Sequence, residues 1–234
     1  MEEKKLTGYP SIDMPQNKGA SFFEKRPIIP NVSIYNSIKL ITAFYKDKSA
    51  INCIDLTANY NQLISDSVTI SRALKELGVK KGDIVSVSMP NYYQAVASFL
   101  ACNRIGAVTT FLNPSASNEE ICEYLNLFES PVLINYDKSN EENIKVKDKT
   151  KVNYIVTLHK DQINSLALDK DYHITSADSI IDFNSLESIS KYQKTGIPTN
   201  SSKDNSLILF TSGTTGKPKS VVLTNENVLA AGIY

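Results

Sequence analysis

The chain of 234 residues is long enough for one large domain or two small ones, and 41% of its residues are hydrophobic. Its 25 basic residues balance its 25 acidic residues, and a formal net charge of zero argues against bulk electrostatic attraction to nucleic acid or to acidic lipid. No apolar run approaches the roughly 18 residues that signal a transmembrane helix, and the N-terminus has no signal-peptide pattern. We therefore expect neither a nucleic-acid partner nor a transmembrane segment.

The cysteine and histidine content gives no sign of a metal site. Cys53, Cys102 and Cys122 are far apart and form no CxxC pair, and the chain has only two histidines, His159 and His173. Buried, reduced thiols in a cytoplasmic protein are the ordinary explanation of such cysteines.

The first part of the chain is expected to be an irregular arm followed by a helix. Residues 1–33 are polar and contain four prolines. In residues 34–45, Ile34, Ile38, Ile41 and Tyr45 recur at spacings of four and three, which predicts a helix with one apolar face. The segment AINCID then predicts a short strand.

From residue 61 onward, helices and strands are expected to alternate. A helix over 61–77 ends at Gly78, and a helix over 92–105 ends at Gly106, since glycine readily takes the positive φ of a helix C-terminus. Ser117 and Glu120 form a capping box that opens a further helix. The short apolar strands between the helices are IVSVSM, AVTTFL and VLI. This order predicts an α/β fold with a mostly parallel sheet flanked by helices.

The second half of the chain mixes polar stretches with apolar runs. Residues 135–151 are almost free of apolar side chains and are expected to form a solvated loop or a partly disordered segment. The sheet resumes at 152–158, and a second polar stretch, 184–206, leads to the strand LILF. A strand VVL follows, and Asn225 or Asn227 is expected to cap a helix that runs to Tyr234.

Between LILF and VVL lies the loop FTSGTTGKPKS, residues 210–220, which has the composition of a phosphate-binding loop. Such a loop needs glycines so that backbone N–H groups can converge on oxygen, hydroxyls as donors, and cations to balance charge. After a buried strand of an open α/β sheet, it should emerge at the carboxyl edge, where ligands bind. The glycines are Gly213 and Gly216, the hydroxyls belong to Thr211, Ser212, Thr214 and Thr215, and the cations are Lys217 and Lys219.

This loop does not follow two other known phosphate-binding patterns. A Walker loop would need Gly at Thr211 and Ser or Thr at Pro218, and the dinucleotide pattern GxGxxG is absent. By composition alone, a flexible Ser/Gly/Thr linker is an alternative. The apolar runs on both sides of the loop speak against a linker between domains.

FTSGTTGKPKSVVLTNENV resembles the signature loop of the adenylate-forming (AMP-binding) superfamily, which includes acyl-CoA synthetases, nonribosomal adenylation domains and luciferases. The segment LGVKKGDIVSVSMPNYYQAVASFLACNRIGAVTTFLNPSASNEEICEYL, from Leu77, is similar to an upstream block of the same superfamily. Together the resemblance spans roughly residues 34–234. It implies the fold of the N-terminal portion of the large domain of these ligases.

The resemblance implies activation of a carboxylic acid by ATP and Mg²⁺, followed by transfer of the acyl group to coenzyme A or to a carrier-protein pantetheine. The hydroxyls of Thr211, Ser212, Thr214 and Thr215 would then donate to phosphate oxygens, and Gly213 and Gly216 would let the loop wrap around them. Lys219 would neutralise the charge on departing pyrophosphate. Lys217 occupies a position that varies among relatives.

Two residues depart from the superfamily pattern. Ser220 stands where glycine is usual, and its Cβ is expected to restrict the backbone. Asn225 stands where relatives often have a histidine near the acyl pocket.

Several parts of the superfamily pattern are absent from this sequence. They are the adenine-binding segment, the ribose-binding Asp, the Mg²⁺-coordinating Glu and the C-terminal domain with its catalytic Lys. We therefore expect 34–234 to be a partial AMP-binding domain from a longer ligase, without catalytic or metal-binding residues and inactive alone. The alternatives are part of a nonribosomal adenylation domain and a short nucleotide-binding protein without catalysis.

Overall fold

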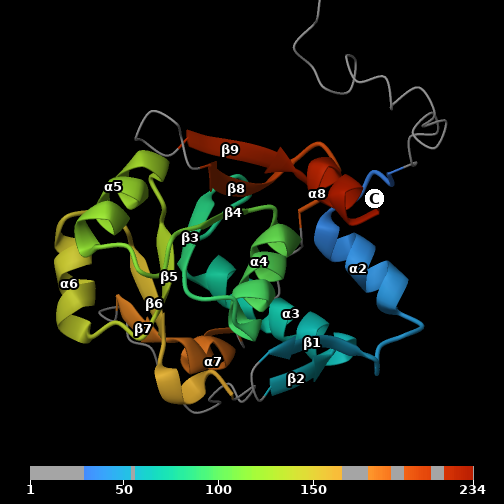
Figure 1. The fold of residues 1–234 in the computed structure, drawn as a ribbon, viewed down its shortest axis with the longest axis horizontal. Helices are drawn as coiled ribbons and strands as arrows, with labels where there is room; N and C mark the ends of the chain where they lie inside the picture. The colour runs from blue at the N-terminus through green and yellow to red at the C-terminus, as the bar shows by residue number, and fades with distance from the viewer. Residues whose placement is uncertain (1–28, 54–55, 165–178, 191–197, 212–218, 234) are drawn as a thin grey trace, which may run out of the picture.

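The structure is a computed structural model that describes residues 29–53, 56–164, 179–190, 198–211 and 219–233. Within them a seven-stranded sheet has the spatial order β7-β6-β5-β3-β4-β8-β9 (Figure 1). Every neighbouring pair is parallel except β8 and β9, which confirms the expected mostly parallel α/β fold. The strands are β3 (Ile84–Ser88), β4 (Val108–Phe111), β5 (Val132–Tyr136), β6 (Tyr154–Leu158), β7 (Ile180–Asp182), β8 (Asn205–Thr211) and β9 (Lys219–Thr224).

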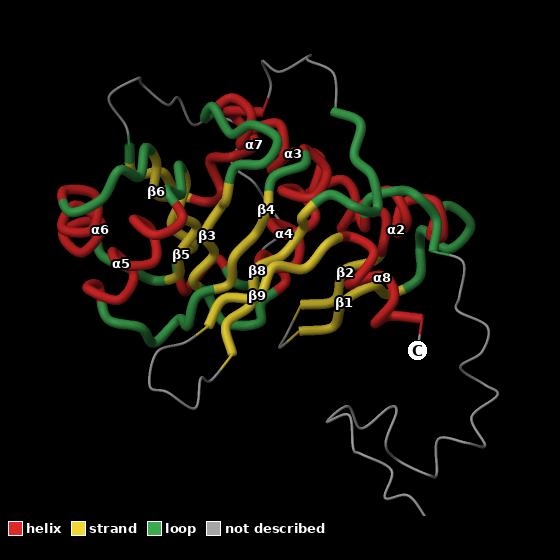
Figure 2. The backbone as a smooth tube through the Cα atoms, turned by 90° about the horizontal axis from the view of Figure 1, so that it is seen from above, coloured by secondary structure: helices red, strands yellow, loops and turns green. Residues whose placement is uncertain are grey.

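Helices cover both faces of this sheet, as Figures 1 and 2 show. On one face lie α5 (Asn118–Phe128) and α6 (Asn140–Asp148), and on the other lie α3 (Tyr60–Glu76), α4 (Tyr93–Ile105) and the short α7 (Leu186–Ser190). Alternate residues of β5 separate the two cores. Val132 and Ile134 belong to the α3–α4 core, whereas Leu133 belongs to the α5–α6 core.

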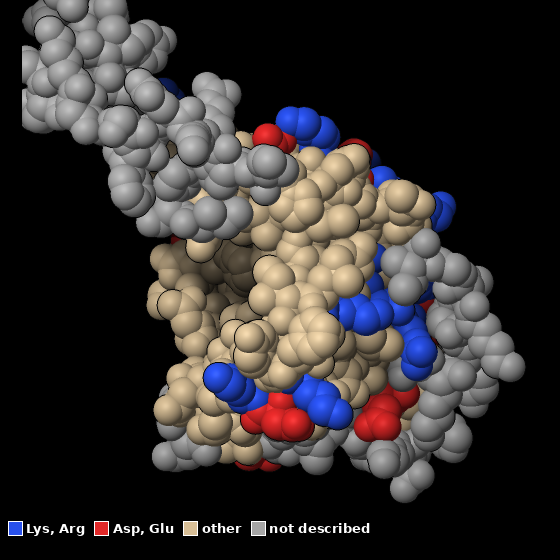
Figure 3. Space-filling view, turned by 90° about the vertical axis from the view of Figure 1, so that its right-hand side faces the viewer, with Lys and Arg blue, Asp and Glu red and all other residues tan. Residues whose placement is uncertain are grey.

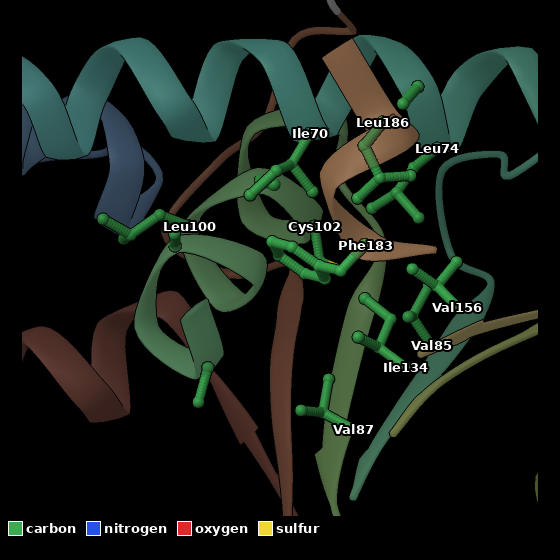
Figure 4. Packing of buried hydrophobic residues seen from close by; sticks show 14 of the residues in the cluster. Ile70, Leu74, Val85, Val87, Leu100, Cys102, Ile134, Val156, Phe183 and Leu186 are labelled. Atoms are coloured by element: carbon green, nitrogen blue, oxygen red, sulfur yellow. The ribbon is translucent and has the colours of Figure 1, made fainter. Parts of the chain in front are cut away.

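The larger core is built where α3, α4 and α7 meet the sheet (Figure 4). Leu74 of α3, Leu186 of α7 and Val85 of β3 are completely shielded from solvent. Burial of such side chains is the main favourable contribution to folding. This core therefore stabilises the sheet from whose strand ends the loops extend.

The helix ends agree with the signals in the sequence. Gly78 and Gly106 have φ values of 88° and 76°, so both end their helices in the left-handed region. At the start of α5, the Ser117 hydroxyl accepts a bond from the Glu120 N–H at 3.2 Å. The Glu120 carboxylate accepts one from the Ser117 N–H at 2.9 Å, which confirms the capping box.

The expectation of a solvated or disordered segment over 135–151 was wrong, because these residues contain the end of β5 and the helix α6. A second capping box, Ser139 with Glu142, opens this helix. Only Asn143 and Val146 are buried along α6, so its apolar pattern is sparse. The capping box and the neighbouring α5 stabilise the helix.

The remaining elements differ from expectation in smaller ways. Helix α2 (Ile34–Thr42) ends three residues before the expected boundary, and β1 (Ser49–Cys53) pairs with an unexpected strand, β2 (Leu56–Asn59), in a separate antiparallel sheet. Cys102 and Cys122 are buried free thiols, whereas Cys53 is partly exposed.

Helix α8 (Asn225–Ile233) has Thr224 as its N-cap residue, where the sequence suggested Asn225 or Asn227, and the Asn227 side chain completes the cap. The Thr224 hydroxyl accepts a bond from the Asn227 N–H at 3.3 Å, and Asn227 Oδ1 accepts one from the Thr224 N–H at 3.0 Å. No helix in the described parts of the chain is long and apolar enough to cross a membrane.

Candidate functional site

The candidate phosphate-binding loop is carried by a β-hairpin at the edge of the main sheet. Strand β8 runs parallel to β4, and β9 returns antiparallel to β8 with Thr211 opposite Lys219. At this neck the Thr211 hydroxyl donates a hydrogen bond to the Lys219 carbonyl at 3.3 Å. The hairpin therefore brings the two ends of the loop together at the carboxyl edge of a parallel strand, which is where the sequence pattern placed it.

Of the loop residues expected to bind phosphate, the structure describes Thr211 and Lys219, which are both exposed. The Thr211 hydroxyl, expected to donate to phosphate, here closes the hairpin neck. The other expected ligands, together with Lys217, lie outside the described residues: Ser212, Gly213, Thr214, Thr215 and Gly216.

Aromatic packing holds the end of β8 against the neighbouring helix. The ring of Phe210 lies 4.6 Å from that of Tyr124 and 5.9 Å from that of Phe128, measured between centroids, and both partners belong to α5. Both ribbon views show this end of the hairpin beside α5 (Figures 1 and 2). Because tilted aromatic pairs at these distances attract one another, the packing gives the loop a fixed starting point.

A buried amide network holds the opposite end of the hairpin. Asn225, directly after β9, accepts a bond from the Asn103 side chain of α4 at 2.6 Å. The same Asn103 amide donates to the Ser206 hydroxyl, near the start of β8, at 3.0 Å. Both strands are thus joined to α4, and Asn225 at 2% exposure has a structural position in this chain.

Ser220 lies within β9, opposite Phe210 of β8. An extended strand accommodates any side chain, so a Cβ at this position is compatible with the hairpin as it stands.

A small pocket also opens at the carboxyl ends of β3 and β5, beside α5 and α6. Most of its polar side chains bond to one another or to neighbours. The Asn135 amide donates to Asn143 at 2.8 Å, the Asn143 amide donates to Thr157 at 2.9 Å, and Lys138 pairs with Glu142 at 3.3 Å. Neither Thr211 nor Lys219 lines this pocket, so it is separate from the described ends of the loop.

The acidic residues that the structure describes do not gather into a metal site. No group of three or more His, Cys, Asp or Glu side chains gathers within the described ranges. Mg²⁺ prefers carboxylate and water oxygens in octahedral geometry, so the described residues alone do not fit a magnesium ligand set.

The supporting residues Asn103, Ser206 and Tyr124 were not predicted as part of the site. Asn103 and Tyr124 meet the hairpin from distant parts of the chain, and 122 residues separate Asn103 from Asn225. Local spacing carries no signal for such contacts.

Comparison with known proteins agrees with the fold. The profile of the family described as "AMP-binding enzyme" matches residues 42–234. A long-chain-fatty-acid–CoA ligase of Bacillus subtilis is 28% identical over 214 residues, which cover 86% of this chain and 38% of the ligase. An acetyl-coenzyme A synthetase of Coprinopsis cinerea is 33% identical over 172 residues, covering 73% of this chain and 26% of the synthetase.

Among solved structures, an anthranilate–CoA ligase, AuaEII, in complex with anthranoyl-AMP superposes with a TM-score of 0.68 at 18% identity. The match covers 85% of this chain and 36% of that one. The fold is therefore that of the N-terminal portion of adenylate-forming ligases, and the chain belongs to the AMP-binding enzyme family. It spans about a quarter to two fifths of the length of the relatives named here.

Proposed function

We propose that this chain forms the pyrophosphate-binding part of an AMP-forming acid–thiol ligase. In this reaction a carboxylate attacks the α-phosphorus of ATP, an acyl-adenylate forms, and pyrophosphate leaves. A thiol then attacks the acyl carbon, a thioester forms, and AMP leaves. The observation that carries the proposal is the placement of a Thr/Ser/Gly/Lys loop between two strands whose ends meet at Thr211 and Lys219.

The chemistry of the loop residues suits a departing polyphosphate. Lys219 is exposed at the neck, where its ammonium group could balance the charge that builds on pyrophosphate. The hydroxyls of Thr211, Ser212, Thr214 and Thr215 supply neutral donors, and Gly213 and Gly216 allow backbone N–H groups to approach. To donate to phosphate, the Thr211 hydroxyl has to leave its bond to the Lys219 carbonyl.

The acceptor thiol proposed here is coenzyme A, because the named relatives are CoA ligases or synthetases. A carrier-protein pantetheine is the second candidate. ATP would be bound with Mg²⁺, but we assign no magnesium ligand to the described residues. The cytoplasm is the proposed location, since ATP and coenzyme A are available there and the buried thiols are free.

Acid-dependent exchange of labelled pyrophosphate into ATP tests this proposal. We expect no exchange by the 234-residue chain, and exchange by a longer product that also contains the parts of the superfamily pattern absent from this sequence. In that longer product, Lys219→Ala should lower the exchange rate by about a hundredfold, the size of effect seen when one charge-stabilising group is lost from an active site. Lys145→Ala on α6, an equally simple loss of an exposed lysine, serves as the control.

An unchanged exchange rate in Lys219→Ala would overturn the role of this lysine. Exchange that starts without any carboxylic acid would overturn the acid–thiol ligase assignment. Transfer of the acyl group to a carrier protein but not to coenzyme A would select the second acceptor.

A further inference from the structure

An exposed apolar corner lies at the end of α2, far from the loop that the proposed function uses. Leu40 and Ile41 are 65% and 67% exposed, and Phe44, in the turn that follows, is 89% exposed. Tyr45 is also mostly exposed. Soluble proteins seldom expose several large apolar side chains next to one another, and such patches mark interaction sites.

The opposite side of α2 is fixed to the rest of the molecule. Ile34 and Tyr35 are buried, and the Tyr35 N–H donates to the Asn103 side chain at 2.8 Å. The turn after α2 is held as well, because the N–H groups of Tyr60 and Asn61 donate to the carbonyls of Lys48 and Lys46. The apolar corner therefore projects from a helix and a turn that are both held by the rest of the molecule.

Basic side chains surround this corner. Lys39, Lys46 and Lys48 are exposed, and Asp47 is the only acidic residue between positions 29 and 53. The Lys48 ammonium lies 5.1 Å from the centre of the Tyr45 ring. Although the whole chain is neutral, this segment carries a local formal charge of +2, from three lysines and one aspartate. Figure 3 shows the face on which α2 lies as largely uncharged, with basic and acidic side chains together at its lower edge.

From this combination we propose that the α2 corner, residues 39–48, binds the surface of an anionic lipid membrane. Aliphatic and aromatic side chains on a protruding turn can enter the boundary between headgroups and acyl chains. Lysines beside them remain at the level of the negative headgroups, where each adds to the attraction. This chemistry matches the exposed side chains at the corner and the charges around them.

The arrangement leaves the candidate phosphate loop free when the corner is bound. In Figure 1 the Thr211–Lys219 end of the hairpin lies on the left of the molecule, beside α5, and α2 lies on the right. A membrane at α2 would therefore meet the side of the protein opposite the end of the hairpin that carries the loop.

Vesicle binding by the 234-residue chain tests the proposal directly. Because the chain has no tryptophan, Phe44→Trp introduces a single fluorescent reporter. We expect its emission to shift to shorter wavelength with vesicles that contain phosphatidylserine, and to shift less with phosphatidylcholine alone or at high salt. Leu127→Trp, at a position as exposed as Ile41 but on α5, is the matched reporter and should not shift.

Co-sedimentation then separates the contributions of charge and apolar contact. Lys46→Gln with Lys48→Gln, and separately Ile41→Ser with Phe44→Ser, should each weaken binding to phosphatidylserine vesicles by about tenfold. The controls are Lys145→Gln with Lys151→Gln, and Leu127→Ser with Ile144→Ser, all at exposed positions on or near α5 and α6. If the serine variant does not fold by circular dichroism, the glutamine pair still decides the result.

Three results would overturn the proposal. They are equal emission shifts of the Phe44→Trp and Leu127→Trp variants, equal binding to neutral and anionic vesicles, and unchanged binding by the lysine variant. Self-association of the wild-type chain that Phe44→Ser abolishes, without vesicle binding, would instead assign the corner to a second copy of the chain.

Discussion

The side-chain amide of Asn103 lies 2.6 Å from Oδ1 of Asn225, although 122 residues separate them in sequence. Both residues are only 2% exposed. Asn225 also accepts a bond from the Ile34 N–H and donates to the carbonyls of Ser201 and Asp204. One side chain therefore joins the start of α2, helix α4 and the segment that leads into the loop-bearing hairpin.

Replacing this side chain should destabilise the fold. Asn225→Ala leaves the Ile34 N–H and one N–H of the Asn103 amide without an acceptor in the protein interior, and we expect a loss of about 2 kcal/mol in the free energy of unfolding. Urea unfolding measures it. Asn153→Ala, at an exposed asparagine, is the control and should change stability by less than about 0.5 kcal/mol. Equal stability of the two variants would contradict a structural role for Asn225.

The sequence allowed the elements to be predicted where local signals were strong. Glycine stops at 78 and 106 and the cap at Ser117 marked the helix ends, and short apolar runs marked β3, β4 and β5. Helix α6 was missed because its residues are mostly polar, although the Ser139–Glu142 spacing carried the same capping signal as α5. That spacing alone marks the start of α6 in the sequence.

The loop itself was predictable, whereas its supports were not. A run of glycines, hydroxyls and lysines after an apolar strand is a local pattern, and it predicted a loop between LILF and VVL, the segments that form β8 and β9. The contacts of Phe210 with α5 and of Asn225 with α4 depend on which helices the fold brings near, and no spacing along the chain encodes that.

A buried carboxylate on α3 should give stability an unusual dependence on pH. Burial raises the pKa of Asp66 above its ordinary value, even though Tyr93 and Gln62 donate hydrogen bonds to it at 2.7 and 2.8 Å. A raised folded-state pKa means that the native state binds the proton more tightly than the unfolded chain. The contribution of Asp66 to stability therefore falls as the pH rises from its unfolded pKa through its folded pKa.

Asp66→Asn should remove this dependence. The variant keeps a similar shape and can still bond with Tyr93 and Gln62, so we expect its stability relative to the wild type to increase as the pH rises above about 4. Urea unfolding at several pH values measures the difference. A constant difference across that range would show that the pKa of Asp66 is not raised in the folded protein.

The pair of Lys81 and Asp204 should act in the opposite direction. Their side chains meet at 2.8 Å, and the hydrogen bond from Lys81, with one from the Ser201 N–H, lowers the pKa of Asp204. This stabilisation is present above the unfolded pKa of the carboxyl and is lost as the pH falls through its lower folded value.

Because both side chains of this pair are partly exposed, Asp204→Asn should cost less than about 1 kcal/mol at neutral pH. The cost should shrink in high salt and at low pH. Lys149→Gln, which removes a more exposed partner of Glu119 at 3.7 Å, is the comparison and should have a smaller effect. A cost for Asp204→Asn that is unaffected by salt and by pH would contradict an ionic contribution.

The last prediction concerns the aromatic support of the loop-bearing hairpin. Phe210→Ala removes the ring that packs on Tyr124 and Phe128, and should cost about 1–2 kcal/mol because the site is only partly buried. In a double-mutant cycle with Tyr124→Ala, measured by urea unfolding, the coupling energy should be about 0.5–1.5 kcal/mol. Leu209→Ala, one residue earlier on β8, should show no coupling to Tyr124 and serves as the control, since successive side chains of a strand point to opposite faces. If Leu209 and Phe210 couple equally to Tyr124, the tilted ring pair does not fix the hairpin against α5.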